Sequence, residues 1–166
     1  MGDITQLAAR LGQHLLEASA QVSTAESCTG GGIAEAITRI PGSSAWFEAG
    51  YVTYSNRQKT QQLGVAHELF QRFGAVSREV VEAMARGAQE KSSSRYSVAV
   101  SGVAGPDGGS IEKPVGTVWI CWCASEQLTA QRFLFPGDRD AVRRQTIEAA
   151  LEGLIQLCCA EITNRG

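Results

Sequence analysis

The feature of this sequence that most constrains its fold is the alternation of short strand-like runs with amphipathic helical stretches. Apolar residues recur with helical spacing over residues 3–18, and the β-prone run 21–25 follows directly. A helical stretch over 30–40 then leads into an aromatic, β-branched strand over 46–54. Such alternation predicts a sheet with helices on both faces. We therefore expect one domain over 1–166, a three-layer α/β/α sandwich over a mixed β-sheet.

The second half of the chain adds a buried strand and a hairpin. The near-continuous apolar run 96–101 predicts a central strand that is covered on both faces. The stretch 102–114 is rich in glycine and proline and is predicted to be a loop, and the strands expected over 115–123 and 127–135 should pair as a hairpin. Helix N-caps are expected at Asp3, which forms a capping box with Gln6, and at Ser55, Ser77 and Asp138.

Charge and composition exclude several classes of partner. Fifteen basic and seventeen acidic residues give a net charge of −2, and no Lys/Arg run is present to attract a nucleic acid. The first residues contain no continuous apolar stretch that would act as a signal peptide or enter a membrane, so we expect a cytoplasmic protein. Five cysteines, an odd number without C-x-x-C spacing, are interpreted as reduced thiols: Cys28, Cys121, Cys123, Cys158 and Cys159.

The segment TAESCTGGG at 24–32 is the first candidate for chemistry. It places Ser27, Cys28 and Thr29 at a strand-to-helix turn, where unpaired N–H groups and the positive helix end attract an anion or a developing oxyanion. A nucleophile is expected in such a place, although the G-x-S-x-G pattern of a nucleophile elbow is absent. The alternative is that Ser27 or Thr29 simply caps the helix.

A serine nucleophile needs a base, and lysine is the candidate that the sequence offers. The chain has only two histidines, His14 and His67, which makes a Ser-His-Asp triad or a histidine-rich metal site hard to assemble. Lys59 lies in the first turn of the helix predicted after the 46–54 strand, and burial there would let it lose its proton. Tyr54 offers a nearby hydroxyl. The alternative for Lys59 is a solvated helix lysine.

Two further segments are candidates for ligand binding. The small residues of SGVAGPDGG at 101–109 leave backbone donors open to a phosphate or a ribose, and Asp107 either meets a ribose hydroxyl or forms an Asx turn. At the start of the last helix, Arg143 or Arg144 could hold a phosphate with two hydrogen bonds. Arg144 could instead form a surface pair with Asp140.

These segments, taken in order, resemble a known family. The motifs are TAESCTGG at 24–31, GSSAWFEAGYVTYSN at 42–56 with Lys59, GAVS at 74–77, SGVAGPDGG at 101–109, KPVGTV at 113–118 and GDRDAVR at 137–143. Together they are similar to the CinA C-terminal domain family over nearly the whole chain. The resemblance implies deamidation of nicotinamide mononucleotide to nicotinate mononucleotide and ammonia, with no metal or other cofactor. We do not expect the functions of the extra N-terminal domain that longer family members carry.

The resemblance and the residues lead to one mechanistic hypothesis. The catalytic residues carried over are Ser27 as nucleophile, Lys59 as base and Tyr54 as its helper, with N–H groups near Thr29 and Gly30 receiving the oxyanion. The predicted substrate-binding residues are Cys28, Thr29, Gly30, Gly31, Ser101, Gly102, Ala104, Gly105, Asp107, Gly108, Arg143 and Arg144.

Two other functions and one other nucleophile remain open on the sequence. The same loops would serve a nucleotide-binding module without catalysis, and Cys28 could replace Ser27 as the nucleophile. An interaction protein linked to competence or DNA damage is suggested by the family's name alone. The expected partner is a small nucleotide, with no nucleic acid and no membrane. We expect a homodimer, with the strand 46–54 and the C-terminal helix as candidate contact surfaces.

Overall fold

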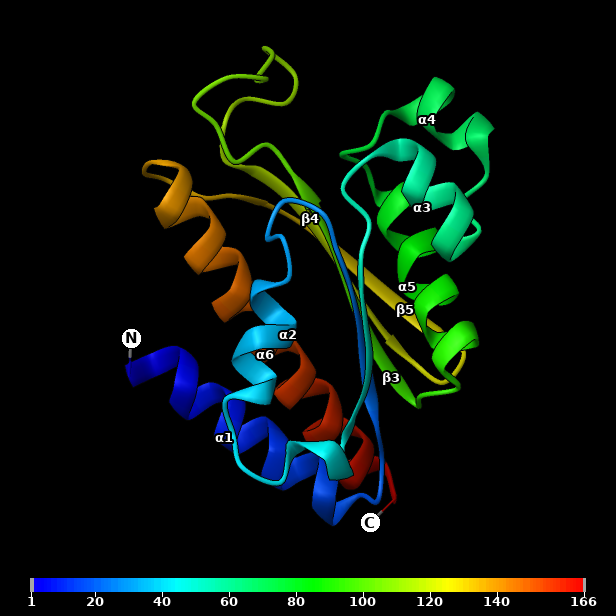
Figure 1. Ribbon diagram of the computed structural model, residues 1–166, viewed down its shortest axis with the longest axis vertical. Coiled ribbons are helices and arrows are strands. Elements are labelled where there is room, and N and C mark those ends of the chain that lie inside the picture. The colour runs from blue at the N-terminus through cyan, green and yellow to red at the C-terminus, as the bar shows by residue number, and fades with distance from the viewer. Residues whose placement is uncertain (1, 166) are drawn as a thin grey trace.

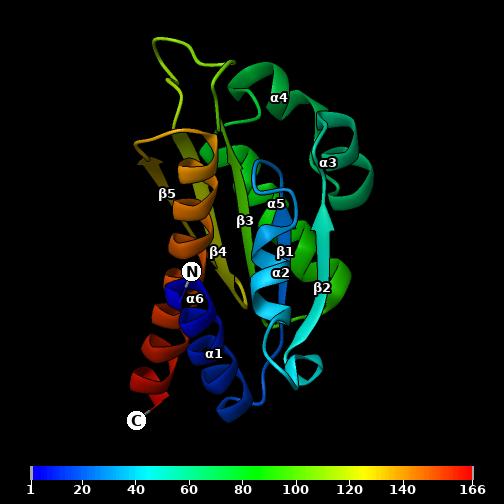
Figure 2. The same cartoon turned by 60° about the vertical axis from the view of Figure 1, so that its left-hand side comes forward.

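Five strands form a single mixed sheet between two layers of helices (Figures 1 and 2). The computed structural model describes the backbone of residues 2–165 and the side chains of residues 3–161. The sheet has the order β2-β1-β3-β4-β5. Its strands are β1 (Val22–Glu26), β2 (Phe47–Val52), β3 (Tyr96–Gly102), β4 (Thr117–Ala124) and β5 (Gln127–Leu134). The predicted three-layer α/β/α sandwich over a mixed sheet is confirmed.

The strand directions place the ends of three strands at one edge of the sheet. β1 pairs in parallel with β2 and β3, and its last residue, Glu26, lies opposite Val52 and Val100. The segments that follow β1, β2 and β3 therefore leave the same edge. β4 is antiparallel to β3 and to β5, so the predicted hairpin is confirmed, and β3 is central as expected.

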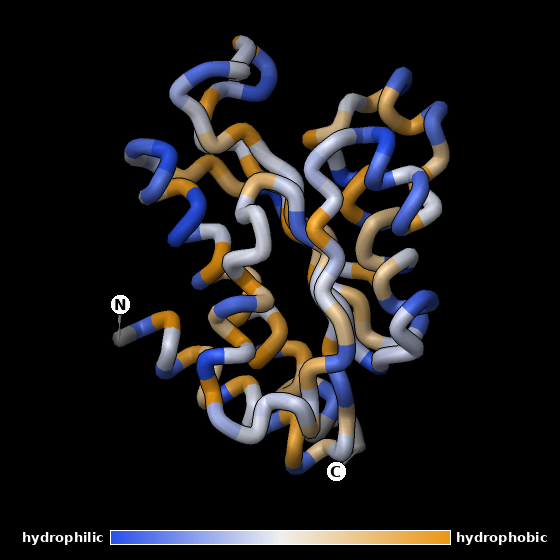
Figure 3. The backbone as a smooth tube through the Cα atoms, viewed as in Figure 1, coloured by the Kyte–Doolittle hydropathy of each residue, from blue (hydrophilic) through white to orange (hydrophobic). Residues whose placement is uncertain are grey.

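One helical layer consists of α1 (Gly2–Glu17), α2 (Gly32–Thr38) and α6 (Arg139–Arg165) (Figure 1). The predicted inner face of the last helix is confirmed, because Ala150, Leu151, Leu154 and Cys158 are buried, with Ile147 half-buried against them. Figure 3 shows that hydrophobic residues recur along the strands and the helices beside them. Their burial is the main source of stability for this layer.

The second layer consists of α3 (Asn56–Leu63), α4 (His67–Phe73) and α5 (Arg78–Ser92), while a short 3₁₀ helix, η1 (Ser43–Ala45), precedes β2. Leu63 and Met84 pack here against the buried face of the sheet, with Ala99 and Cys121. The closest approach is at Gly87 of α5, where a Cβ atom would lie 2.0 Å from the carbonyl oxygen of Leu63. Glycine at this position therefore lets α5 approach the end of α3.

Most of the predicted helix N-caps are present. The hydroxyl of Ser55 accepts a hydrogen bond from the Gln58 N–H at 3.1 Å, and that of Ser77 accepts one from the Val80 N–H at 3.3 Å. The carboxylate of Asp138 accepts one from the Ala141 N–H at 2.9 Å. The capping box at Asp3 is wrong, because α1 begins at Gly2 and already includes Asp3 in its first turn. A carboxylate there still lies near the positive helix end.

Two predictions from the sequence concern the cellular compartment: reduced cysteines, and the lack of an apolar stretch that would enter a membrane. Among residues 3–161, the five cysteines form no disulfide with one another, and only Cys159 among them is exposed. Over the described residues, no helix combines the length and apolar character needed to cross a bilayer.

Candidate active site

The hydroxyl of Ser27 and the amine of Lys59 meet at one backbone oxygen. Ser27 directly follows β1, and Lys59 lies in α3 beyond the end of β2. The Ser27 hydroxyl donates to the carbonyl oxygen of Tyr54 at 3.5 Å, and Lys59 Nζ donates to the same oxygen at 2.9 Å. Parallel pairing of β1 with β2 brings these two groups, 32 positions apart in the sequence, to a common acceptor.

Lys59 is buried, so its interpretation as a solvated helix lysine is wrong. The residue is only 1% exposed, and it lies on α3 with Leu63, the other buried residue of that helix. Loss of hydration lowers the pKa of Lys59 below its ordinary value of 10.5, because burial disfavours the charged ammonium. An amine that gives up its proton more easily is suited to act as a base.

Cys28 lies beside Ser27 but is chemically unsuited to replace it. Burial raises the pKa of the Cys28 thiol to about 12, and the nearby carboxylate of Glu26 adds to this effect. The thiol therefore stays protonated at neutral pH, whereas the thiolate is the reactive form of cysteine. This protonation argues against Cys28 and leaves Ser27 as the candidate nucleophile.

The turn after Ser27 is held by the carboxylate of Glu26, a residue to which the sequence analysis gave no role. Gly31, in a left-handed conformation that glycine adopts readily, is the N-cap of α2 and provides no side-chain cap. The carboxylate of Glu26 instead accepts hydrogen bonds from the N–H groups of Ile33 at 2.8 Å and Ala34 at 3.0 Å. The alternative in which Ser27 or Thr29 caps this helix is therefore wrong.

One of the two predicted oxyanion donors is already in use. The N–H of Gly30 donates to the carbonyl oxygen of Ser27 at 3.0 Å, which removes it from the predicted oxyanion site. The hydroxyl of Thr29 donates to Glu26 at 2.5 Å, so only the backbone N–H of Thr29 remains as a donor from this residue. The neighbouring N–H of Cys28 is the next candidate.

Two arginines of α6 reach these loops. Arg139 donates to the carbonyl oxygen of Gly105 at 2.7 Å and to the Tyr54 hydroxyl at 3.2 Å. Arg143 donates to the carbonyl oxygen of Thr29 at 3.1 Å, and its Nε is buried without a hydrogen-bond partner. Arg144, the other predicted arginine, is exposed and makes none of these contacts. Arg139 was not predicted. The sequence feature that could have identified it is its spacing of four residues from Arg143, which puts both side chains on the same face of α6.

The Tyr54 side chain does not take the predicted position beside Lys59. It is 61% exposed, and its hydroxyl meets Arg139, whereas its backbone carbonyl holds Lys59 and Ser27. The contact of Tyr54 with the two catalytic candidates is thus made by the main chain.

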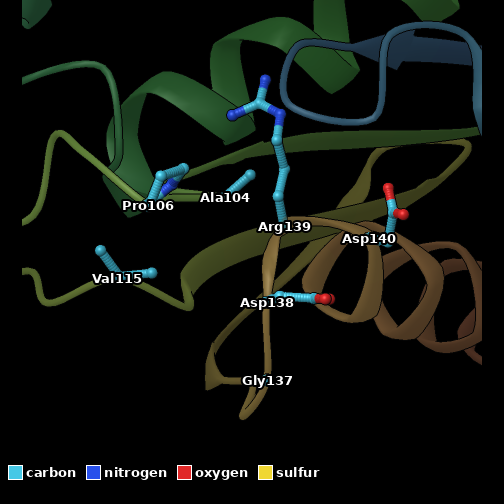
Figure 4. A pocket seen from close by; sticks show the side chains of 7 residues that line it. All are labelled: Ala104, Pro106, Val115, Gly137, Asp138, Arg139 and Asp140. Carbon is cyan, nitrogen blue, oxygen red and sulfur yellow. The ribbon is translucent and has the colours of Figure 1, made fainter.

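A pocket of about 480 Å³ opens between the 104–106 loop and the start of α6 (Figure 4). It is lined by Ala104, Pro106, Val115, Gly137, Asp138, Arg139 and Asp140. In Figure 4 the Arg139 side chain extends from the first turn of α6 past Ala104 and Pro106. Ser27 and Lys59 do not line this pocket, but Arg139 bonds to Tyr54, whose carbonyl they share.

The remaining predicted loop residues divide into two groups. Ser101 is buried at the end of β3, and Gly102 ends that strand. Asp107 and Gly108 are exposed, and neither lines the pocket. Within residues 3–161, no three His, Cys, Asp or Glu side chains gather as a metal site.

The fold and this arrangement define a class of protein. It is a three-layer α/β enzyme domain whose candidate site lies at the carboxyl ends of parallel strands, where ligands bind in open α/β sheets. The model of the CinA C-terminal domain family matches residues 4–158. The chain belongs to the CinA C-terminal domain family, which confirms the resemblance drawn from the six motifs.

Individual relatives are similar over nearly their full length. Nicotinamide-nucleotide amidohydrolase PncC of Pseudomonas putida is 69% identical over 157 residues, which cover 95% of this chain and 98% of that protein. PncC of Escherichia coli K12 is 53% identical over 93% of this chain and 94% of that protein. The crystal structure of the competence/damage inducible protein CihA from Agrobacterium tumefaciens superposes with a TM-score of 0.93 at 45% identity, covering 95% of this chain and 96% of that chain.

Proposed function

We propose that this protein is a nicotinamide-nucleotide amidohydrolase, which converts nicotinamide mononucleotide and water to nicotinate mononucleotide and ammonia. Two relatives that align along nearly the whole chain carry that enzyme name. The observation that supports the chemical part of the proposal is the shared acceptor at Tyr54, to whose carbonyl oxygen both the Ser27 hydroxyl and the buried amine of Lys59 donate. A hydroxyl beside a base is the arrangement that nucleophilic amide hydrolysis needs.

The proposed reaction has two halves. In the first, Ser27 Oγ attacks the carboxamide carbon while neutral Lys59 takes the hydroxyl proton, and N–H groups at Cys28 and Thr29 stabilise the oxyanion. The C–N bond then breaks, Lys59 returns the proton to the nitrogen, and ammonia leaves an ester on Ser27. In the second half, water attacks the ester, Lys59 takes its proton, and the serine oxygen leaves and recovers that proton.

Arg139 and Arg143 are the proposed phosphate-binding residues. Both extend from α6 toward the loops at the strand ends, and Arg143 keeps a buried Nε without a partner. Guanidinium groups bind phosphate with paired, charge-assisted hydrogen bonds. The pocket beside Arg139 would then take the phosphoribosyl half of the substrate. We also propose a cytoplasmic location, in keeping with five cysteines that form no disulfide among the described residues.

The direct test is to incubate the purified protein with nicotinamide mononucleotide and to quantify both products. We expect ammonia and nicotinate mononucleotide in equal amounts. Ser27→Ala should keep the fold and bind the nucleotide without releasing ammonia, whereas Ser44→Ala, at the exposed 3₁₀ helix η1, serves as the matched control with full turnover. A folded wild-type protein that binds the nucleotide and releases no ammonia would establish the nucleotide-binding module instead.

A further inference from the structure

We infer that Glu26 is a positioning residue, which holds Ser27 and the oxyanion donors in their reactive arrangement; this inference rests on the proposed function. Glu26 is the last residue of β1 and is completely buried. It directly precedes Ser27, and its carboxylate accepts three hydrogen bonds. These come from the Thr29 hydroxyl at 2.5 Å, the Ile33 N–H at 2.8 Å and the Ala34 N–H at 3.0 Å.

The three bonds fix both sides of the turn that carries Ser27. Glu26 belongs to the rigid strand on one side, and Ile33 and Ala34 belong to the first turn of α2 on the other. Thr29 lies between them, so its bond to Glu26 sets the path of the backbone whose N–H groups are the proposed oxyanion donors. A change at Glu26 therefore alters the position of the reacting groups.

The main chain of Glu26 holds the second catalytic segment as well. Its carbonyl oxygen accepts a hydrogen bond from the Thr53 N–H at 2.9 Å, immediately before Tyr54. The carbonyl of Tyr54 is the acceptor shared by Ser27 and Lys59. Glu26 thus bonds to the turn of the nucleophile and to the segment that orients the base.

A simple helix cap does not account for this arrangement. Helix caps are commonly short polar side chains at the N-cap residue itself, but Gly31 at the N-cap of α2 is left-handed and has no side chain, and the bonds come instead from a buried carboxylate five residues earlier. Burial of a carboxylate costs far more than burial of a hydroxyl, and only good hydrogen bonds offset that cost. Arg143 adds a positive charge to the same network through the Thr29 carbonyl. Buried polar networks of this kind fix one geometry, which is what a nucleophile and its oxyanion donors require.

The test compares two variants of Glu26 with a matched control. Glu26→Asp keeps the charge but shortens the side chain, while Glu26→Gln keeps the length but turns an N–H₂ group toward a backbone N–H. The control is Glu35→Gln on α2, the helix that Glu26 caps, where the exposed carboxylate of Glu35 pairs with Arg39. Because misplacement of a reacting group by about 1 Å costs on the order of 10²-fold in rate, we expect kcat to fall by about that factor in both variants, with KM little changed.

A second readout measures Ser27 without the nucleotide substrate. A fluorophosphonate probe phosphonylates a reactive serine: the serine oxygen bonds to phosphorus, fluoride leaves, and the hydroxyl proton passes to the base. We expect Ser27 in the wild type and in Glu35→Gln to react at the same rate, and Ser27 in the Glu26 variants to react on the order of 10²-fold more slowly. If the wild type releases no ammonia, the proposed substrate is wrong, and the labelling rates still decide the role of Glu26.

Results that would overturn the inference are equally specific. Folded Glu26 variants with wild-type kcat and wild-type labelling of Ser27 would reduce Glu26 to a structural cap, as would a loss confined to thermal stability. If neither variant folds, Thr29→Val removes only the hydroxyl bond to Glu26 and leaves the bonds to α2 in place. The same slow labelling and low kcat are expected there, and unchanged values would refute the positioning role.

Discussion

Replacement of Gly87 by alanine should lower kcat, because it displaces α3, the helix that carries Lys59. Gly87 lies in α5, where an added Cβ would stand 2.0 Å from the carbonyl oxygen of Leu63 and 2.9 Å from its carbonyl carbon. Leu63 is the last residue of α3, the helix that carries Lys59. Real Cβ contacts are essentially never shorter than 3.0 Å, so α3 has to move by about 1 Å or α5 has to leave the sheet.

The expected magnitudes follow from that displacement. Overpacking of a core costs about 1–3 kcal/mol, while the gain in helix propensity from glycine to alanine is about 0.5–1 kcal/mol. The net loss is therefore roughly 0–2.5 kcal/mol, which lowers Tm by up to about 10 °C in a domain of this size. A shift of Lys59 by about 1 Å should lower kcat on the order of 10²-fold.

Thermal unfolding followed by circular dichroism and steady-state ammonia release measure the two effects. Gly64→Ala is the matched control: Gly64 ends α3 in a left-handed conformation, and no atom lies within 4 Å of its added Cβ. This control should lose stability through backbone strain and keep kcat. The reasoning is refuted if Gly87→Ala is as stable and as active as the wild type, or if Gly64→Ala loses kcat equally.

Three further predictions concern the site itself. Cys28→Ala should retain turnover in the ammonia assay, because a thiol with a pKa of about 12 is protonated at neutral pH and is not the nucleophile. Turnover measured against pH should rise as Lys59 loses its proton, with a midpoint below 10.5, because the neutral amine is the base. Since the unfolded chain binds this proton more tightly than the folded one, the free energy of unfolding should also rise with pH between the folded-state pKa of Lys59 and 10.5. Lys59→Met should abolish the pH dependence of turnover and of the free energy of unfolding that Lys59 causes. It should not lower Tm, because an apolar side chain replaces an amine that is only 1% exposed. Arg139→Met should raise KM for the nucleotide roughly tenfold or more through loss of a charged hydrogen bond to the phosphate. Equal KM values for Arg139→Met and Arg144→Met would contradict the assignment of Arg139 as a phosphate-binding residue.

The elements of the fold were predictable because local patterns determine them. Apolar spacing distinguishes strands from helices, and Ser55, Ser77 and Asp138 mark helix starts through their own side chains. The failure at Asp3 shows the limit of such patterns, since α1 begins at Gly2, two residues before the start that a cap at Asp3 predicts. Residues 115 and 116, predicted as strand, lie outside β4, where Gly116 has a positive φ of 98°.

The site was predictable only in part, because sequence spacing does not determine distance in space. The proximity of Ser27 and Lys59 depends on parallel pairing of β1 with β2, which no local pattern specifies. The choice among the arginines depends on helix register, because a shift of one residue turns a side chain by about 100°. Glu26 was missed because a carboxylate at a strand end usually faces solvent. The alternation of side chains along β1 was the one available indication that it faces the helices.

The central claim is that Ser27 forms an ester with the substrate while Lys59 acts as its base. Mass spectrometry of the enzyme, quenched in acid during turnover of nicotinamide mononucleotide and digested to peptides, tests this claim most directly. The account predicts that the acyl group of nicotinate mononucleotide is attached to Ser27 in the wild type and is absent from Ser27→Ala, which should also release no ammonia. An adduct on Cys28, or undiminished ammonia release by Ser27→Ala, would contradict the account.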